Sequence, residues 1–369
     1  MQRAVLILGG YGNFGKRIAS ALVKTGVSVI VAGRDQEKAE ALVRSLPGNL
    51  ASAACFDARR DLDTQLKTLK PAVVVNTCGS FQNSDYGIAE SCIRCGTHYI
   101  DLADGRDFVA GIATLDRSAK EAGVAVVAGA STVPGLSSAV IEHFKSEFSE
   151  ISSLKYGISP GQKAERGLAT TQGILSYVGR PLRPFVGQVG PTYGWQDIYR
   201  QPYPEIGKRW MANCDVPDLD LLPPRYGIKS IRFSAGLELG FMHLGLWALS
   251  WLVRLGFPID LPRHAKLLLK ISDAFDAVGS AAGGMHMILR GKSLQGKNYE
   301  RRWFIIAHDG QGPHIPTIPA IVLAEKLARG ELDVRGALPC VGLVLLEEYL
   351  ARMREYNVVT HSEVSGWGN

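Results

Sequence analysis

The sequence predicts an α/β protein in which a doubly wound parallel sheet is followed by a second, α+β domain. Three observations support this fold class. The first third of the 369-residue chain alternates short apolar runs with helical segments, joined by short connections. A glycine-rich turn directly follows the first apolar run. After about Pro134 the alternation stops, and strand-like runs are separated by long connections. Alternating strands and helices are typical of a parallel sheet covered by helices on both faces.

Six apolar runs rich in Val, Ile and Ala are the predicted strands of this sheet. Short runs between turn residues are typical of strands that are buried on both faces. The runs are Ala4–Leu8, Ser28–Ala32, Ala51–Phe56, Ala72–Asn76, His98–Leu102 and Val124–Ala128. Helical spacing fills the gaps, for example at Ala39, Leu42, Val43 and Leu46, with Asp35 placed to cap that helix.

The rest of the chain is expected to add a mixed domain, returning helices and a tail. The predicted elements are a helix at Leu136–Phe148, a strand at Leu154–Ser159, a helix at Ala169–Val178, loops from Pro181 to Pro224, strands at Ile228–Ser234, Met285–Arg290 and Arg302–Ala307, and a helix at Ile318–Leu332. We therefore expect a sheet domain at 1–135, an α+β substrate and dimerisation domain at 136–315, helices returning to the first domain at 316–355, and a flexible polar tail at 356–369.

Composition and charge exclude several classes of protein. Hydrophobic residues make up 46% and charged residues 21%, which is ordinary for a globular protein. The net charge of +6 is spread along the chain without a dense basic run, so we expect no nucleic-acid partner, whereas an anionic cofactor or substrate suits it.

The cysteines and the start of the chain indicate a reducing compartment. The six cysteines show no disulfide-framework spacing, and the first predicted strand begins almost at Met1, so we expect no signal peptide and a cytoplasmic protein. Cys92 and Cys95 form a lone CxxC pair without a second ligand pair, and we expect packed thiols rather than a metal site.

One long apolar stretch allows several interpretations. Leu237–Phe257 is nearly long enough to span a bilayer, but Glu238, His243 and Arg254 interrupt it. A buried or dimer-interface helix is the first interpretation. A helix that lies on a membrane surface or guards an apolar substrate tunnel is the second, and a transmembrane span is the third.

The strongest local motif is the turn after the first strand. Gly10, Gly12 and Gly15 form G-x-G-x-x-G, with Asn13 and Phe14 opening a helix. In this pattern the first glycine allows the tight turn, the second admits a pyrophosphate and the third allows close helix–strand packing, while the helix N-terminus supplies amide donors. Residues 1–135 are therefore expected to be a Rossmann-type NAD(P)-binding domain.

The end of the second strand distinguishes the two cofactors. An NAD site places a carboxylate there, but this sequence has Arg34, which suits a 2′-phosphate and favours NADP. Lys38 is a possible second contact. The alternatives are a solvated Arg34 at a helix start, and a different register in which Asp35 meets the ribose. Asp57, after the third strand, is either an adenine contact or a plain turn residue.

Three further segments resemble a known family. Asn76–Phe81 with Tyr86-Gly87, Gly96–Asp104, and Gly129–Gly135 are similar to motifs of the saccharopine dehydrogenase-like NADP-binding oxidoreductases, especially their uncharacterised bacterial members. The resemblance covers the first 140 residues and continues loosely beyond them. Ser80-Phe81 and Ala103-Asp104 depart from the family's usual Pro-Tyr and Gly-Glu pairs. These departures argue against saccharopine as the substrate, and the Trp-rich stretch indicates a more apolar one.

The resemblance implies an NAD(P)-dependent oxidoreductase that transfers a hydride to or from a small or partly apolar substrate, in a cleft between two domains. Because ligands of such sheets bind at the carboxyl ends of the strands, the turns after strands four to six supply the candidate side chains. Cys78, Gly79 and Phe81 are the expected cofactor and substrate wall; Asp101, Tyr99 and Tyr86 are the catalytic candidates; and His98 is a lesser one. The alternative is a non-catalytic NADP-binding sensor or scaffold. We expect a homodimer in either case.

Overall fold

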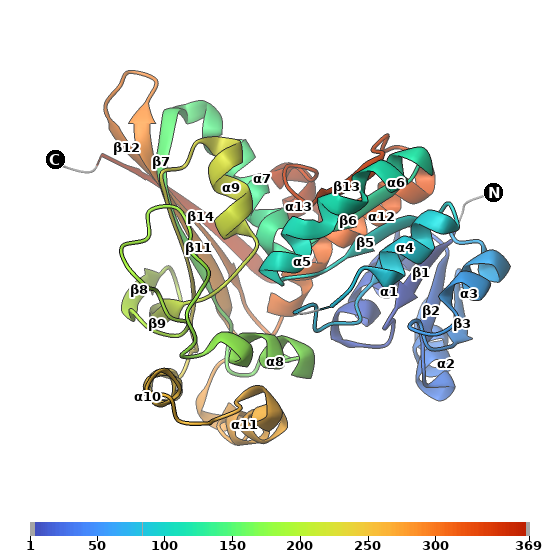
Figure 1. Cartoon of the computed structure of the whole chain (residues 1–369), viewed down its shortest axis with the longest axis horizontal. Helices are drawn as coiled ribbons and strands as arrows, with labels where there is room; N and C mark the ends of the chain where they lie inside the picture. Colours follow the sequence, from blue (N-terminus) through green and yellow to red (C-terminus); the bar gives the residue numbers. More distant parts are fainter. Residues whose placement is uncertain (1–3, 83, 367–369) are drawn as a thin grey trace. The chain divides into compact units, whose positions relative to one another are not determined.

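The computed structural model describes residues 4–82 and 84–366, which form two compact units (Figure 1). The first unit contains the described residues up to Ala139 together with His314–Tyr349. The second contains Val140–Pro313 and the described residues from Leu350 onward. Each unit is built around its own seven-stranded sheet. The chain therefore leaves the first unit, returns to it and ends in the second.

The sheet of the first unit is parallel throughout and has the order β13-β6-β5-β4-β1-β2-β3. Its strands are β1 (Val5–Leu8), β2 (Val29–Gly33), β3 (Ala51–Cys55), β4 (Val73–Asn76), β5 (His98–Asp101), β6 (Ala125–Ala128) and β13 (Gly336–Pro339). All residues of β1, β4 and β6 are buried, as expected of strands covered on both faces. The six predicted strands and the doubly wound fold class are confirmed. The seventh strand, β13, lies in a segment that was predicted to be helical.

Helices cover both faces of this sheet, because right-handed crossovers from β1 run in opposite directions in its two halves. On one face α1 packs against α12, and on the other α3 packs against α4. The helical elements of this unit are α1 (Asn13–Lys24), α2 (Gln36–Ser45), α3 (Leu62–Leu69), α4 (Gly87–Arg94), α5 (Arg106–Gly111), η1 (Ile112–Leu115), α6 (Asp116–Glu121), η2 (Thr132–Leu136) and α12 (Ile318–Arg329). Three further elements cross the boundary between the units: α7 (Ser137–Phe144), η6 (Gly312–Thr317) and α13 (Leu346–Met353).

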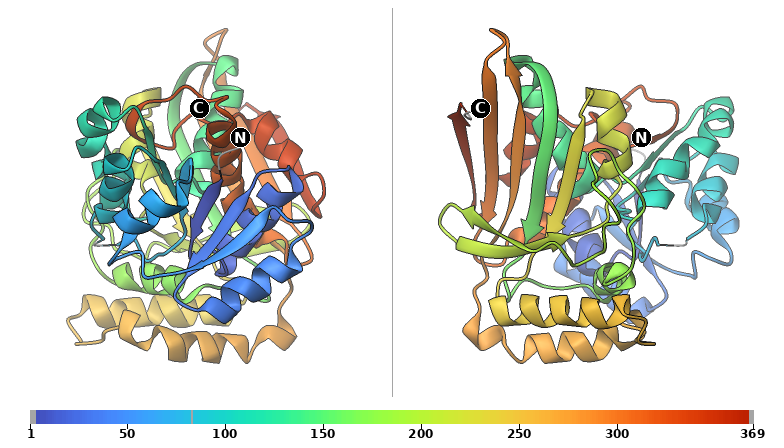
Figure 2. Two further views of the ribbon diagram at one scale, coloured as in Figure 1. Left: turned by 90° about the vertical axis from the view of Figure 1, so that its right-hand side faces the viewer. Right: turned by 60° about the vertical axis from the view of Figure 1, so that its left-hand side comes forward.

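The sheet of the second unit is mixed and has the order β14-β12-β11-β7-β10-β9-β8. Only β10 and β7 pair in parallel; the other pairs are antiparallel. The strands are β7 (Phe148–Ser159), β8 (Tyr199–Tyr203), β9 (Gly207–Asn213), β10 (Ser230–Ala235), β11 (Gly283–Ser293), β12 (Asn298–Ala307) and β14 (Val358–Ser365). The helical elements are η3 (Lys145–Glu147), α8 (Leu168–Tyr177), α9 (Asp218–Tyr226), α10 (Gly240–Arg254), η4 (Pro262–His264), α11 (Ala265–Asp273) and η5 (Asp276–Val278). Figure 2 shows α10 and α11 lying side by side next to the end of this sheet.

The predicted flexible tail at 356–369 is wrong for its described part. Residues 358–365 form β14, which pairs with β12 over eight residues. Only three of the eight residues of this strand are apolar (Val358, Val359 and Val364), because β14 is an edge strand with one face toward solvent. A half-polar edge strand resembles a loop in composition, which explains the error.

The predicted loop region at 181–224 is also partly wrong, because it contains β8, β9 and the start of α9. Pro202 lies in β8, at the edge of the sheet, where a residue without an N–H is tolerated. Two prolines lie in the last part of α9, which ends at Gly227 with φ 68°. The loop prediction was therefore misled by prolines that lie at the edge of a sheet and near the end of a helix.

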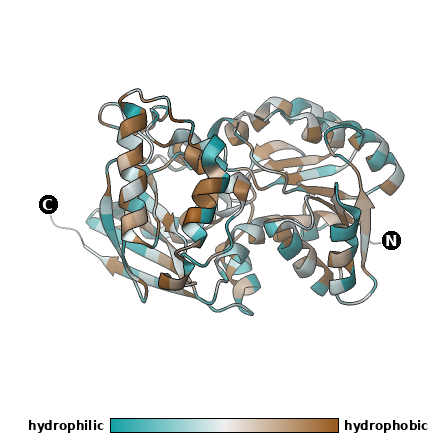
Figure 3. Ribbon diagram, turned by 90° about the horizontal axis from the view of Figure 1, so that it is seen from below, coloured by the Kyte–Doolittle hydropathy of each residue, from teal (hydrophilic) through white to brown (hydrophobic). Residues whose placement is uncertain are grey.

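The apolar stretch 237–257 forms α10, but most of this helix is not buried. Only two residues of α10 are buried, the polar His243 and Ser250. The prediction of a buried helix is therefore wrong for the chain as described, while the interface and membrane-surface interpretations stay predictions. Figure 3 looks onto the side on which α10 and α11 lie and shows hydrophobic residues along both helices. In the described part of the chain, no helix combines the length and the apolar character needed to cross a bilayer.

Candidate cofactor and catalytic site

The glycine turn after β1 is tightly packed. The Gly12 N–H donates to the Gly9 carbonyl at 2.8 Å, and the Gly10 N–H donates to the Ala32 carbonyl at 3.0 Å. The left-handed conformation of the turn lies at Gly9, with φ 72°, one residue before the first glycine of the motif. A Cβ on Gly10 would instead lie 2.8 Å from a methyl group of Val31. Gly10 is therefore required for packing against β2.

The other two motif glycines have the expected surroundings. A Cβ on Gly15 would lie 2.4 Å from the Gly9 carbonyl oxygen, so only glycine allows α1 to approach β1. Gly12 is exposed, and the only atom near a Cβ there would be the same oxygen, at 3.0 Å. Space beside Gly12 is open, next to the first turn of α1, where Asn13 and Phe14 present backbone amides. This cradle fits a pyrophosphate group, which a side chain at Gly12 would displace.

At the end of β2, the side chain of Asp35 is occupied by its own helix. Its Oδ1 accepts the Lys38 N–H at 3.1 Å, and its Oδ2 lies 3.0 Å from the Lys38 Nζ. The hydrogen bond from Lys38 holds the pKa of the Asp35 carboxyl below its ordinary value. Because both oxygens are engaged, the geometry favours Arg34, which is exposed, as the residue that meets the cofactor here. Lys38 is exposed beside Asp35.

Two arginines that the motifs did not single out lie at the end of β3. Asp57 accepts the Arg59 N–H at 3.0 Å, and its other oxygen lies 3.9 Å from the Arg60 Nε, so Asp57 shapes the turn. Both arginines are exposed. Desolvation raises the pKa of the Cys78 thiol, and the charges of Arg59 and Arg34 oppose that rise. The two guanidinium groups therefore gather near the carboxyl end of β4. The adjacent arginines after a predicted strand were the only sequence signal for this.

The turn after β4 lies against the glycine turn. A Cβ on Gly9 would lie 2.8 Å from the Thr77 Oγ1 and 3.1 Å from the Cys78 Sγ. The Thr77 hydroxyl donates to the Leu8 carbonyl at 2.8 Å, which ties the ends of β1 and β4 together. The structure thus brings Cys78 to the glycine turn. Gly79 follows, exposed, and the Gly79–Ser80 peptide bond is cis.

Asp101, the last residue of β5, is completely buried. Its Oδ1 accepts the Ala103 N–H at 2.9 Å and the Gly129 N–H at 2.8 Å. Its Oδ2 has no hydrogen-bond partner among the described residues. Burial raises the pKa of Asp101 to about 6, although the two backbone donors and the nearby Tyr99 hydroxyl act in the opposite direction. This is a carboxyl group that changes its protonation state near neutral pH.

Three other candidates have different surroundings. Tyr99 is buried on the same strand, and its hydroxyl accepts the Asn76 Nδ2–H at 3.1 Å. The Tyr86 hydroxyl donates to the Phe108 carbonyl at 2.8 Å, so it fastens the chain to α5. His98 is the first residue of β5, at the opposite end of the strand from Asp101, and its Nδ1 accepts the Ala125 N–H at 2.9 Å. Of the three, only Tyr99 lies beside both Asp101 and the cavity described next.

A cavity of about 760 Å³ opens at the carboxyl ends of β4 and β5 within the first unit. Its walls come from the turn with Arg59 and Arg60, the first turn of α3, and the segment around Cys78 and Phe81. Asn76 and Tyr99 reach it from the strands. Phe81 is buried against Phe108, with ring centroids 5.3 Å apart, and forms an apolar wall. The cavity therefore combines cationic, polar and apolar sides.

The cysteine pair on α4 takes no part in this site. Cys92 is buried, and the Cys95 thiol donates to the Asp63 carbonyl at 3.8 Å. Within residues 4–82 and 84–366, no group of three or more His, Cys, Asp or Glu side chains is arranged to hold a metal ion.

The fold and this turn define a nucleotide-binding α/β protein whose cofactor site lies at the carboxyl edge of a doubly wound sheet. Comparison with known families identifies the particular type: residues 5–127 match the saccharopine dehydrogenase NADP binding domain. The first unit therefore contains an NADP-binding domain of the saccharopine dehydrogenase type, and the resemblance predicted from the sequence is confirmed.

Individual proteins show similarity of sequence in one case and of fold in another. An uncharacterized oxidoreductase of Bacillus subtilis (strain 168), YvaG, is 33% identical over 91 residues, which are 23% of this chain and 34% of the relative. The chain thus spans about a third of the length of this curated relative. The apo saccharopine dehydrogenase (L-Glu forming) from Saccharomyces cerevisiae has a TM-score of 0.70 at 12% identity, covering 99% of this chain and 100% of that one. At that identity, the likeness shows the fold alone.

A third protein, serine dehydrogenase from Escherichia coli, is 17% identical over 34% of this chain and 80% of its own. Its TM-score of 0.28 supports no conclusion about this chain.

Proposed function

We propose that this chain is an NADP-dependent oxidoreductase that transfers a hydride to or from a small or partly apolar substrate. The observation that carries the proposal is the carboxyl group of Asp101, at the end of a central strand. It is buried, has one oxygen without a partner among the described residues, and has a pKa of about 6. A group that gains or loses a proton near neutral pH is suited to general acid–base catalysis.

The geometry of the turns supports the cofactor-binding residues that we propose. Gly10, Gly12 and Gly15, with the amides of Asn13 and Phe14, would hold the pyrophosphate, and Cys78 and Gly79 would border the bound cofactor. Arg34, with Arg59 as a second cation, would hold the 2′-phosphate, since guanidinium groups form strong charge-assisted hydrogen bonds with phosphate. Lys38 and Asp57 are weaker candidates for cofactor binding, because Lys38 is paired with Asp35 and Asp57 accepts the Arg59 N–H. When bound, NADP supplies or accepts the hydride.

The remaining residues would bind and orient the substrate and move a proton. Asp101 would hold or release the proton at Oδ2, because Oδ1 is occupied by two backbone donors. Tyr99, whose hydroxyl is oriented by Asn76, would act as a positioning residue beside it. Phe81 would supply an apolar wall that suits a partly apolar substrate. Tyr86 has a weaker claim to catalysis, because its hydroxyl already donates to a backbone carbonyl.

The test combines a substrate screen with a matched pair of variants. Amino acids, imines and enoyl lipids are offered to the protein while NADPH consumption is followed. With a substrate in hand, Asp101→Asn is expected to bind NADPH normally and to lose at least about a hundredfold in kcat. Asp104→Asn, in the same loop, controls for a lost charge and should change kcat by less than about threefold. Wild-type turnover in Asp101→Asn would overturn the role of Asp101.

One observation favours a second candidate function, a non-catalytic NADP-binding sensor or scaffold. The side chain of Asp101 has no exposed surface, so a substrate can reach it only if neighbouring residues move. The same screen separates the two functions, because a sensor binds NADPH and consumes it with none of the compounds. Turnover of any of them with NADPH would exclude the sensor.

A further inference from the structure

An unusual apolar surface lies on the second unit, along α10, α11 and the segment that follows. We call it the hairpin surface. It contains ten of the sixteen large hydrophobic residues that are exposed in the described chain. They are Phe241, Leu244, Trp251, Leu252, Leu255, Phe257, Leu267, Ile271, Phe275 and Val278. Isolated exposed hydrophobic residues are common, but a contiguous group of this size marks an interaction site.

The helix α10 has its polar residues on the inside. The buried His243 accepts the Trp195 Nε1–H at its backbone carbonyl at 3.4 Å, and the buried Ser250 accepts the Gln196 Nε2–H at 3.4 Å. No charged residue occurs between Glu238 and Arg254. The outward side of α10 therefore carries almost no group that can hydrogen-bond with water. An ordinary surface helix has the opposite arrangement, with its polar residues outside and its apolar residues buried.

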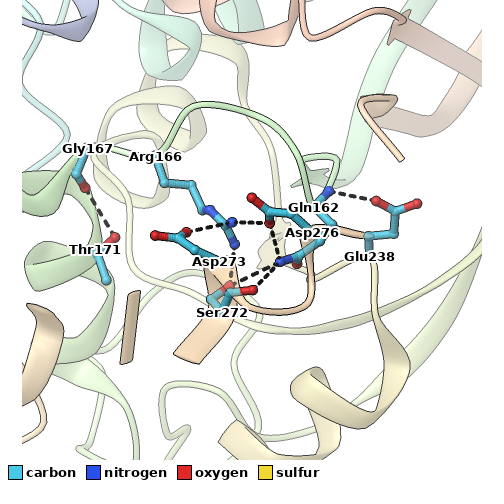
Figure 4. A network of polar contacts seen from close by, with 8 residues as sticks. All are labelled: Gln162, Arg166, Gly167, Thr171, Glu238, Ser272, Asp273 and Asp276. Carbon is cyan, nitrogen blue, oxygen red and sulfur yellow. Dashed lines mark hydrogen bonds and ion pairs between the residues drawn. The ribbon is translucent and has the colours of Figure 1, made fainter. Parts of the chain in front are cut away.

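A polar network fixes this helical pair in place (Figure 4). The Arg166 guanidinium lies 3.1 Å from Asp273 and 2.9 Å from Asp276, just beyond α11. Before α10, the Glu238 carboxylate accepts the Gln162 N–H at 2.6 Å, and the Gln162 side chain donates to Asp276 at 2.9 Å. Both ends of the hairpin are thus bonded to one loop. These contacts fix the orientation in which its apolar side points outward.

The hairpin surface is also cationic. Arg263, Lys266 and Lys270 are exposed and have no carboxylate partner among the described residues. The acidic groups of this region are Asp273, the last residue of α11, Asp276, and the exposed Asp260. Asp273 and Asp276 share the single guanidinium of Arg166, and Asp260 accepts the Arg263 N–H. Three carboxylates thus face five basic groups (Arg166, Arg254, Arg263, Lys266 and Lys270), which leaves a small positive excess.

An aromatic residue and an arginine lie at the C-terminal end of α10. The Arg254 guanidinium lies 4.8 Å from the Trp251 ring centroid. Tryptophan and basic side chains around an apolar face are typical of helices that lie in the interface of a bilayer.

We propose that the hairpin surface binds the surface of a membrane that contains anionic lipids. Phe241, Leu252 and Leu255 would enter the boundary between headgroups and acyl chains, and Lys266 and Lys270 would meet the headgroups. The 15 residues of α10 give a length of about 22 Å, against about 30 Å for a bilayer core, so the helix would lie along the surface.

A second copy of the chain is a poorer occupant. Lys266 and Lys270 alternate with Leu267 and Ile271 along α11, within the apolar surface. In a two-fold self-interface these amines would be desolvated close to those of the partner, and the carboxylates of the surface, Asp260, Asp273 and Asp276, are too few to compensate all of its basic groups. A lipid headgroup layer neutralises the same amines while the leucine and isoleucine side chains enter the apolar region.

The test is flotation of the full-length chain with vesicles, which is independent of any enzyme activity. The wild type is expected to float with vesicles of phosphatidylcholine and phosphatidylglycerol, and at least about tenfold less with phosphatidylcholine alone. Leu255→Glu should reduce binding at least about tenfold, because it places a charge in the entering face. Leu294→Glu is the matched control: Leu294 is 65% exposed against 70% for Leu255, but lies outside the hairpin surface, so it should bind like the wild type.

The electrostatic part is tested with a second pair. Lys266→Gln with Lys270→Gln should lower binding to anionic vesicles about tenfold or more, whereas Lys208→Gln with Lys297→Gln, two exposed lysines elsewhere, should not. Failure of the wild type to float with anionic vesicles would overturn the proposal, as would equal losses in Leu255→Glu and Leu294→Glu. A wild-type dimer in light scattering that Leu255→Glu converts to a monomer would assign the surface to a second copy instead.

Discussion

At the scale of single residues, the choice between the two nicotinamide cofactors depends on what happens at the end of β2. Asp35 is the residue that would hold a ribose hydroxyl, yet both of its oxygens serve the start of α2. We propose that Arg34 meets the cofactor instead. The sequence could predict the cap at Asp35 because a helix cap is a local feature, readable from Asp35 and the helical spacing after it.

Arg34→Ala is expected to weaken NADPH binding about ten- to hundredfold, since a charge-assisted hydrogen bond to phosphate contributes about 1.5–3 kcal/mol. NADH binding should change little. The measurement is a titration of wild type and variant with both cofactors at two salt concentrations, and the preference for NADPH should shrink at high salt. Arg44→Ala, an exposed arginine on α2, is the control. Equal losses for NADH and NADPH would assign Arg34 to adenine stacking or to the fold.

The raised pKa of Asp101 should change how the free energy of unfolding depends on pH. Its folded-state pKa of about 6 lies above the ordinary value of 3.8, so the folded chain retains this proton after the unfolded chain has lost it. The free energy of unfolding should therefore fall as the pH rises from about 4 to 6, and stay lowered above that range, by about 3 kcal/mol.

Asp101→Asn removes this titration and is the comparison. Unfolding by urea at pH 3, 4, 5, 6 and 7 should show the wild type losing about 3 kcal/mol relative to the variant across the series. Parallel curves for the two proteins would mean that Asp101 titrates normally in the folded chain.

The position of two arginines near Cys78 could not be predicted from any single segment of the sequence. The glycine motif was readable because its function resides in consecutive residues. Arg59 and Arg34 lie 25 positions apart in the sequence, and both come near Cys78 because β3 and β2 are neighbours in the sheet. The left-handed conformation of Gly9 is a further detail that the motif did not predict.

At the scale of elements, burial on both faces made the central strands predictable and exposure made the edges difficult. β1, β4 and β6 are apolar at every position that the pattern used, apart from Asn76 at the carboxyl end of β4. β14 and β8 lie at opposite edges of the second sheet, where polar residues and a proline are tolerated. The pattern of apolar and polar residues therefore indicates solvent exposure at least as much as it indicates secondary structure.

Val359→Ala tests whether β14 contributes to the second unit. Val359 packs against the buried cluster that contains Tyr203 and Phe304, so its truncation should cost about 1 kcal/mol of unfolding free energy. Val364, on the same strand but 55% exposed, is the control, and Val364→Ala should cost less than about 0.5 kcal/mol. Chemical denaturation measures both. Equal, negligible effects would mean that this strand is frayed in solution.

At the scale of the whole molecule, the first unit is assembled from two separated parts of the chain. Residues 314–349 contribute α12 and β13, and nine of the twelve residues of α12 are buried. Side chains of α12 pack on β4 and β5, the strands that carry the candidate site. The cofactor-binding segment is therefore not a free-standing N-terminal domain, although every glycine of its motif lies within the first fifteen residues.

A fragment of residues 1–139 is accordingly expected to show no cooperative thermal transition, because the surface that α12 covers would face water. Joining 1–139 to 314–349 through a flexible linker should restore the transition and NADPH binding. Calorimetry and cofactor titration of both fragments test this. The same fusion with Leu323→Asp, which places a charge in the buried side of α12, is the control and should behave like 1–139 alone. A cooperative transition in 1–139 alone would contradict the prediction.

The return of the chain to both sheets has a consequence for biosynthesis. Translation proceeds from the N-terminus, and domains commonly fold as they emerge. Here β13 completes the first sheet and β14 completes the second, and of the described strands they are the last two to be made. Until residues 336–365 have left the ribosome, β6 and β12 each present an unpaired strand edge. The nascent chain must therefore keep these two edges from pairing wrongly until those residues have emerged, and we expect chaperones to be needed during that period.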